Sequence, residues 1–395
     1  MLRSRIRIPL FLLAAVSLTA CSAASADEAP SRAGGADAGA ASGTPAKVTV
    51  APPAAGRPVT VTASGGSLAK VKVVDADGAE LTGRTAGGGG SWTSDRKAAP
   101  GASYTVEVTS RGAGGKETTS RSTYAIPAAG KVNKLTLAPG KNTTVGVAQP
   151  LSIVFDHPVR NKAEVEKQLK VTTSSPTEGS WGWLTDYSGK DRVDWRPKSY
   201  WKPGTKVTLE ATLNGTDSGD GGGWFVRDYR TGFTVDSVAR VVKVDLDRHR
   251  LTVERDGRAV RTIPVSGGTP GGDKRSWRGT AVLMAKEGTI NMNSETVGLG
   301  DAYDKDVDFS MRLTWSGMYA HAAPWNAPYF GRANKSSGCI GMSDADAASF
   351  YASVRVGDPF EIKGADTKGV VAPGNGYGAW NLSWEQWKAK SALNG

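Results

Sequence analysis

The chain has 395 residues, more than one ordinary hydrophobic core accommodates, so several domains are expected. Its 50 glycines and frequent Val/Thr alternation favour β-rich domains over a helical bundle. A net charge of +11 often indicates nucleic acid, but an N-terminal export signal argues against that partner and leaves the polyanions outside the membrane.

Residues 1–20 are predicted to be a signal peptide rather than part of the fold. Arg3, Arg5 and Arg7 precede an apolar stretch that is too short to span a bilayer as a mature helix. The segment ends in Leu-Thr-Ala-Cys21, which resembles the lipobox of bacterial lipoproteins. The resemblance implies cleavage before Cys21, a lipid on its sulfur and a location on the outer face of the cytoplasmic membrane. An ordinary signal peptide with an incidental cysteine is the alternative.

Residues 21–46 are small and polar, which predicts a flexible tether. Residues 47–137 and 138–237 each contain short alternating strands separated by Gly, Asp and Pro turns, the pattern of two immunoglobulin-like β-sandwiches in series. The second holds five tryptophans that we expect to pack in the sandwich rather than bind glycan: Trp181, Trp183, Trp195, Trp201 and Trp224.

Residues 238–364 form a third β-rich segment, in which Asp256-Gly257 predicts a hairpin turn. Its clearest helix follows Ser343 as the cap and covers 344–354, with Ala348, Phe350 and Tyr351 available to face inward. Residues 365–395 form a Trp-rich tail. Trp380, Trp384 and Trp387 are spaced for one short helix, which we expect to pack on the third segment.

One histidine and one cysteine are the candidate catalytic residues. If Cys21 is lipidated, Cys339 is the only thiol left, so it cannot form an intramolecular disulfide. A thiol with an ordinary pKa of about 8.5 needs a nearby base to act as a nucleophile at neutral pH, and His321 lies eighteen residues upstream. These residues predict a cysteine acyltransferase or hydrolase, while an inert buried cysteine is the competing interpretation.

The surrounding sequence resembles the L,D-transpeptidase (YkuD-type) family. The family pattern is a histidine, some fourteen to seventeen residues, then Ser/Thr-x-Gly-Cys, and fourteen residues separate His321 from Ser336 here. The resemblance extends through 303–308, 315–321 and the Trp-rich tail, and the two preceding sandwiches match the actinobacterial, lipoprotein form of the family. It therefore covers nearly the whole mature chain and implies a mainly β fold.

The resemblance assigns roles residue by residue. Cys339 is the expected nucleophile, His321 its base, the Ala322 carbonyl the group that orients the imidazole, and the Gly338 backbone part of the oxyanion site. Substrate-binding positions are Met292, Tyr303, Trp315, Ser316, Gly317, Ser336 and Ser337. No cofactor is implied, and no metal-ligand cluster is visible in the sequence.

The implied reaction joins two peptidoglycan stem peptides. Cys339 attacks the position-three carbonyl of a tetrapeptide stem, D-Ala leaves, and an acceptor amine forms a 3→3 crosslink. The resemblance also singles out carbapenem β-lactams as inhibitors. Ser337 and Gly341 depart from the family pattern, which often has His at the first position and usually has Asn or Arg at the second. The alternatives are an L,D-carboxypeptidase with the same site and an inactive wall-binding lipoprotein.

Overall fold

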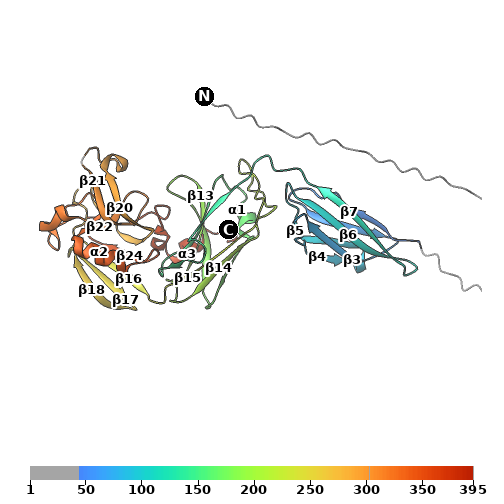
Figure 1. Cartoon of the computed structure of the whole chain (residues 1–395), viewed down its shortest axis with the longest axis horizontal. Coiled ribbons are helices and arrows are strands. Elements are labelled where there is room, and N and C mark those ends of the chain that lie inside the picture. Colours follow the sequence, from blue (N-terminus) through green and yellow to red (C-terminus); the bar gives the residue numbers. More distant parts are fainter. Residues whose placement is uncertain (1–43, 302, 395) are drawn as a thin grey trace, which may run out of the picture. The chain divides into compact units, whose positions relative to one another are not determined.

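The computed structural model describes residues 44–301 and 303–394, so the predicted signal peptide and Cys21 lie outside the described residues. Figure 1 colours the chain from blue through green and yellow to red. In the described part of the chain, strands dominate and helices are short. No helix in those residues is both long enough and apolar enough to cross a membrane.

The first sandwich packs two antiparallel sheets face to face. One sheet has the order β1-β2-β5-β4 and the other β3-β6-β7. Along β6 (Ser103–Gly112) every second residue is buried, the period expected of a strand with one face on a core. Trp92 and Val106 lie in that core. The remaining elements are β1 (Lys47–Val50), β2 (Pro58–Ser64), β3 (Gly66–Asp75), β4 (Gly83–Ala86), η1 (Gly87–Gly89), β5 (Ser91–Lys97) and β7 (Glu117–Ala125).

The second sandwich is built from sheets of order β12-β13-β10-β8 and β11-β14-β15-β9. Four of the five tryptophans expected to pack are buried in its core, and the rings of Trp195 and Trp201 stack 5.2 Å apart. The elements are β8 (Leu135–Ala138), β9 (Thr144–Val145), β10 (Leu151–Phe155), α1 (Lys162–Glu166), β11 (Leu169–Thr173), β12 (Gly179–Thr185), β13 (Asp191–Pro197), β14 (Lys206–Ala211) and β15 (Tyr229–Val235).

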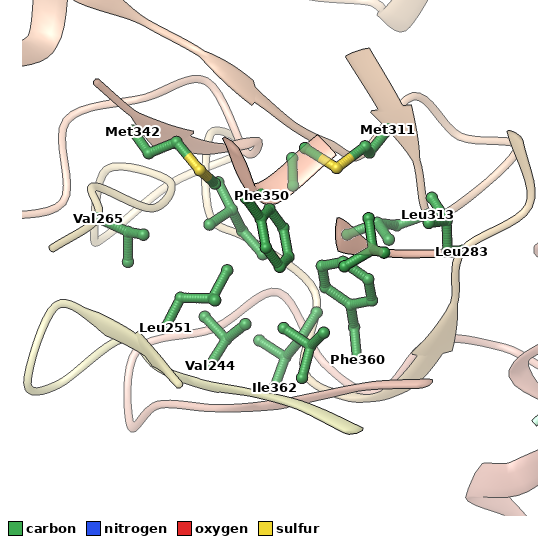
Figure 2. Close-up of a cluster of buried hydrophobic side chains, with 14 of the residues drawn as sticks. Val244, Leu251, Val265, Leu283, Met311, Leu313, Met342, Phe350, Phe360 and Ile362 are labelled. Atoms are coloured by element: carbon green, nitrogen blue, oxygen red, sulfur yellow. The ribbon is translucent and has the colours of Figure 1, made fainter. Parts of the chain in front are cut away.

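The third segment contains two further sheets. One has the order β18-β17-β16-β24-β19, and the other β20-β21-β22-β23. Between them lies an apolar core that contains Val244, Ile362, Met342 and Phe350, with the Phe350 ring near its centre (Figure 2). The strands are β16 (Arg240–Asp245), β17 (Arg250–Arg255), β18 (Arg258–Pro264), β19 (Gly279–Val282), β20 (Ala285–Asn293), β21 (Asp304–Arg312), β22 (Tyr319–Ala322), β23 (Ile340–Met342) and β24 (Pro359–Lys363).

Two local predictions for this segment can be compared with the structure. Asp256 and Gly257 join β17 to β18 with φ values of 49° and 77°, the left-handed pair that a tight hairpin turn requires. Ser343 caps α2 (Asp344–Ser353) by accepting a hydrogen bond from the Asp346 N–H, as predicted. Ala347 rather than Ala348 is the fully buried alanine, because it shares the helix face of Phe350.

The expected packing of the Trp-rich tail is wrong in part. Trp380 lies in η4 (Gly378–Asn381), and only the other two tryptophans lie in α3 (Trp384–Lys388). All three contact the second sandwich, because the guanidinium of Arg196 on β13 lies 4.8, 5.5 and 5.1 Å from the Trp380, Trp384 and Trp387 ring centroids. In Figure 1 the red helix α3 accordingly lies beside the green strands.

Backbone contacts complete this attachment. The Trp387 indole packs so closely on Gly182 that a Cβ at that position would lie 2.7 Å from the ring. Beyond the helix, the Trp183 N–H donates to the Lys390 carbonyl over 2.9 Å, and the Ala392 N–H donates to the Glu166 carboxylate over 2.7 Å. The end of the tail therefore packs on the second sandwich, whereas Asn381 pairs with Thr280 of the third segment, whose N–H donates to its side-chain oxygen over 2.7 Å.

Candidate active site

His321 and Cys339 are brought together by one parallel strand pair. In the register of β22 and β23, His321 lies opposite Gly341 and Ala320 lies opposite Ile340. Side chains two residues apart on a strand share a face, so Cys339, two residues before Gly341, projects to the same side as His321. Both side chains line one cavity of about 200 Å³. The structure thus juxtaposes the two residues that the motif singled out.

The imidazole of His321 is fixed in one tautomer. Its Nδ1 lies 2.6 Å from the Ala322 carbonyl oxygen, and because a carbonyl only accepts, Nδ1 carries the proton. In the neutral ring Nε2 is then unprotonated and free to accept a proton. The Ala322 carbonyl occupies the place that a carboxylate holds in a Ser-His-Asp triad.

Burial keeps both reactive groups uncharged at neutral pH. Desolvation lowers the pKa of His321 to about 4, against the opposing hydrogen bond to Ala322 and with a further lowering by the nearby Lys305 charge. Desolvation raises the pKa of the Cys339 thiol to about 11, opposed by a backbone contact with Tyr319. Desolvation therefore favours the neutral thiol and the neutral imidazole over their charged forms.

Ser336 shapes the turn that presents the cysteine. Its Oγ donates to the Cys339 carbonyl over 2.6 Å and accepts from the Gly338 N–H over 3.1 Å. Ser276 Oγ donates to the Gly338 carbonyl over 2.8 Å, and Gly338 has a φ of 121°, where a side chain would be strained. The Gly338 N–H is thus already engaged, whereas the Cys339 N–H has no partner among the residues that the structure describes.

A second loop, residues 313–318, contacts the sulfur. The Cys339 Sγ lies 3.6 Å from the Gly317 carbonyl oxygen. Ser316, the preceding residue, is held at both ends by Asn375, which accepts from the Ser316 N–H over 2.9 Å and donates to its Oγ over 2.8 Å. Trp315 is 48% exposed, with the Arg312 guanidinium over its ring.

The predicted substrate-binding residues are divided among three adjoining cavities. Met292, Tyr303, Ser336 and Ser337 line the 200 Å³ cavity with Cys339 and His321. Trp315, Ser316 and Gly317 do not, and they line neighbouring cavities of about 40 and 370 Å³. Tyr303 lines all three, and burial together with the nearby Cys339 raises the pKa of its hydroxyl. Tyr303 therefore lies where the three cavities adjoin.

Gly341 is the residue that departs most from the expected motif. It is buried directly across from His321, and a Cβ built on it would lie 2.8 Å from the Ala323 Cβ. Phe330 closes the same space, 3.9 Å away. The room for a larger side chain is therefore occupied by neighbours of the base.

Five residues that the sequence did not single out also line the His321–Cys339 cavity: Lys305, Val307, Trp325, Asn326 and Lys335. The signal was present for Lys305, because Tyr303-Asp-Lys-Asp-Val-Asp308 alternates in the way a strand does. Lys335 directly precedes Ser336, so its position next to the Ser-x-Gly-Cys motif was the signal that it lies near the cavity.

Two other features fall outside this site. A cavity of about 590 Å³, lined by Arg240, Lys286 and Tyr377 among others, shares no residue with the Cys339 cavity. Within residues 44–301 and 303–394 no group of three or more His, Cys, Asp or Glu side chains is arranged to hold a metal.

Comparison with known proteins agrees with this geometry. Residues 50–217 match a model described as a bacterial Ig domain, and residues 239–362 match a model described as an L,D-transpeptidase catalytic domain. L,D-transpeptidase 2 of Mycobacterium tuberculosis is 33% identical over 344 residues, 85% of this chain and 81% of that protein. L,D-transpeptidase 1 of the same organism is 32% identical over 63% of this chain and 92% of its own length.

A solved structure gives the same result. An L,D-transpeptidase in complex with imipenem superimposes with a TM-score of 0.50 at 32% identity, covering 59% of this chain and 100% of that one. The expected mainly β fold, with an immunoglobulin-like region before the domain that carries Cys339, is confirmed.

Proposed function

The chain belongs to the L,D-transpeptidase family, and from that premise we propose that it forms 3→3 crosslinks through an acyl-enzyme on Cys339. The thiol attacks the carbonyl of the diamino acid at position three of a tetrapeptide stem while His321 Nε2 accepts its proton. His321 returns that proton to the departing D-Ala amine. A side-chain amine of a second stem then attacks the thioester and releases Cys339.

The observation that carries this proposal is the fixed tautomer of His321 in the cavity of Cys339. The 2.6 Å hydrogen bond from Nδ1 to the Ala322 carbonyl leaves Nε2 as the only ring atom able to exchange a proton with sulfur or amine. Because desolvation disfavours the thiolate and the imidazolium, the substrate carbonyl meets a neutral Cys339 thiol and a neutral His321 imidazole. The base functions in both half-reactions.

Backbone donors support the developing oxyanion. The Gly338 N–H is held by Ser336, so the Cys339 N–H is the donor that we assign to the carbonyl oxygen. In this assignment Gly338 adopts the positive φ that the turn requires. Ser336 holds the turn by two hydrogen bonds and so orients the Cys339 N–H. The position of the nucleophile and of its donor thus depends on the same three residues.

Product analysis with purified tetrapeptide muropeptides tests the reaction. We expect wild-type protein to release D-Ala and give 3→3 dimers, and Cys339→Ser to give neither. Tripeptide without dimer would instead indicate the L,D-carboxypeptidase. A folded wild-type protein that yields no product would favour the wall-binding lipoprotein.

β-Lactams are expected to react at the same sulfur. The related protein solved with imipenem supports a carbapenem adduct here, since a nucleophile that attacks a peptide carbonyl also opens a strained lactam ring. Intact-mass analysis should show one carbapenem per wild-type chain and none on Cys339→Ser. Unmodified wild-type protein would contradict the expectation.

We also propose a membrane anchor, on the sequence of residues 1–21 alone. Lipidation of Cys21 would hold the sandwiches and the enzyme at the outer face of the cytoplasmic membrane, facing the wall. Cell fractionation should find wild-type protein with membranes and Cys21→Ala released from them. Membrane retention of the variant would refute the anchor.

A further inference from the structure

Strand alternation sorts the charges of β21. Tyr303, Lys305 and Val307 line the Cys339 cavity, while Asp304 and Asp306 turn to the other face and accept hydrogen bonds from Asn291 over 2.9 and 3.3 Å. Lys305 pairs across the hairpin with Met292, which lines the cavity too. One charged residue of this strand, a lysine, therefore faces the nucleophile, and its acidic neighbours do not.

A second lysine faces the cavity from the motif loop. Lys335 directly precedes Ser336, and no residue that lines this cavity is acidic. In the described residues neither Lys305 nor Lys335 has a carboxylate within salt-bridge distance. Two lysines and no acidic residue therefore line the cavity.

The charge of Lys305 lies near His321 and lowers the pKa of its imidazole. The Lys305 Nζ is 4.2 Å from the ring centroid of Trp325, and that ring is 6.0 Å from the His321 ring. Trp325 is 44% exposed, and its ring contacts both the Lys305 ammonium and the His321 imidazole. An anionic group held by the lysines would lie beside whatever exchanges a proton with His321.

We propose that Lys305 and Lys335 form a subsite for the carboxylate beside the reacting amine, and this inference rests on the proposed function. The two half-reactions present the same chemistry to His321. In the first, the C–N bond to D-Ala breaks, and the departing amine carries an α-carboxylate on its carbon. In the second, an amine attacks the thioester carbon, its proton passes to His321 Nε2, and Cys339 leaves as the thiolate.

Because one nitrogen atom of His321 serves both amines, the incoming amine must occupy the place that D-Ala has left. The subsite then favours an acceptor whose amine has a neighbouring free carboxylate, the arrangement found in a diaminodicarboxylic acid. A lysine side chain lacks that carboxylate, and an amidated residue has lost its charge. Two lysines also disfavour a protonated acceptor amine and so favour the nucleophilic form.

Binding to Cys339→Ser protein tests the subsite apart from turnover. D-Alanine and D-alaninamide differ only in the carboxylate, and NMR titration should show D-alanine binding about tenfold or more tightly. Adding Lys305→Met and Lys335→Met should abolish the difference, whereas Lys305→Arg with Lys335→Arg should keep it. Lys170→Met, on the exposed side of β11, is the matched control.

Kinetics separate the two sources of carboxylate. The acylation arm compares stems ending in D-alanine and in D-alaninamide, and the aminolysis arm compares diaminopimelate with lysine as acceptor at position three. We expect the methionine variants to raise the acceptor KM and to erase both preferences. A loss confined to one arm, or equal binding of D-alanine and D-alaninamide in the titration, would overturn the shared subsite. Absent acylation beside normal D-alanine binding would instead refute the proposed function alone.

Discussion

Gly341 and Ala323 share one small space beside the base, so that a Cβ at position 341 would lie 2.8 Å from the Ala323 Cβ. Gly341→Ala should therefore lower the free energy of unfolding by about 1–3 kcal/mol through overpacking. The double variant with Ala323→Gly should recover most of that loss, because the two substitutions are coupled. Urea denaturation measures the cycle, and additive effects would show that the two positions do not compete for space.

The pH dependence of acylation follows the pKa of His321. Because burial lowers that pKa to about 4, the base stays neutral in mildly acidic solution, and the acid limb of the acylation rate should lie near pH 4. Lys305→Met should move the limb to higher pH, since the lysine charge lowers the His321 pKa. A wild-type limb near the ordinary histidine value of 6.5 would contradict the burial argument.

The same residue makes stability depend on pH. Between about pH 4 and 6.5 the unfolded chain binds a proton at His321 that the folded chain does not, so stability falls as pH drops through this window. His321→Gln should remove that contribution. Its Tm should decline less than that of wild-type protein between these pH values, and parallel declines would exclude a neutral buried imidazole.

Cys339 should react slowly with iodoacetamide at neutral pH. Desolvation raises the pKa of its thiol to about 11, so the reactive thiolate is scarce until strongly alkaline solution. The rate of alkylation, measured by intact mass, should still be rising above pH 9. A plateau reached below pH 8 would indicate a preformed thiolate and a different mechanism.

Ser336 and its neighbour Ser337 offer a matched comparison. Ser336→Ala removes both hydrogen bonds that hold the Gly338–Cys339 turn, so acylation should slow by tenfold or more. The Ser337 side chain makes no hydrogen bond to any described residue, so Ser337→Ala should retain most of the rate. Equal rates for the two variants would show that the turn is held by other contacts.

Arg196 should be essential to the attachment of the tail. Arg196→Met removes the cation that contacts three tryptophan rings and the hydrogen bond of 3.1 Å to the Leu382 carbonyl. We expect a loss of about 1–3 kcal/mol and increased proteolysis of the tail. Arg230→Met, whose side chain is 76% exposed, is the control. An unchanged Tm for Arg196→Met would refute the attachment.

The sequence identified the two residues that meet in the cavity, but it did not identify all of the residues around them. His321 and Cys339 were predictable because the motif fixes their spacing, but their common cavity depends on the parallel register of β22 and β23. The alternation of residues 303–308 puts Lys305 on the same strand face as Tyr303, and the pairing of β20 with β21 adds Met292 to that face. The contact of the tail with the second sandwich was missed because nothing in the spacing of the tail indicates Arg196, nearly two hundred residues upstream.

The hydrogen bond from the Ala392 N–H to Glu166 means that the second sandwich can be completed only after the C-terminal tail has been synthesised. The second sandwich is translated before the tail. Its Glu166 carboxylate therefore lacks the Ala392 N–H, which lies 226 residues further along the chain, until the tail has been synthesised. Until the tail is translated, the surface around Gly182 that Trp387 covers in the folded protein stays exposed. A nascent chain stalled just after β24 would contain both His321 and Cys339 yet expose this apolar face to chaperones and proteases.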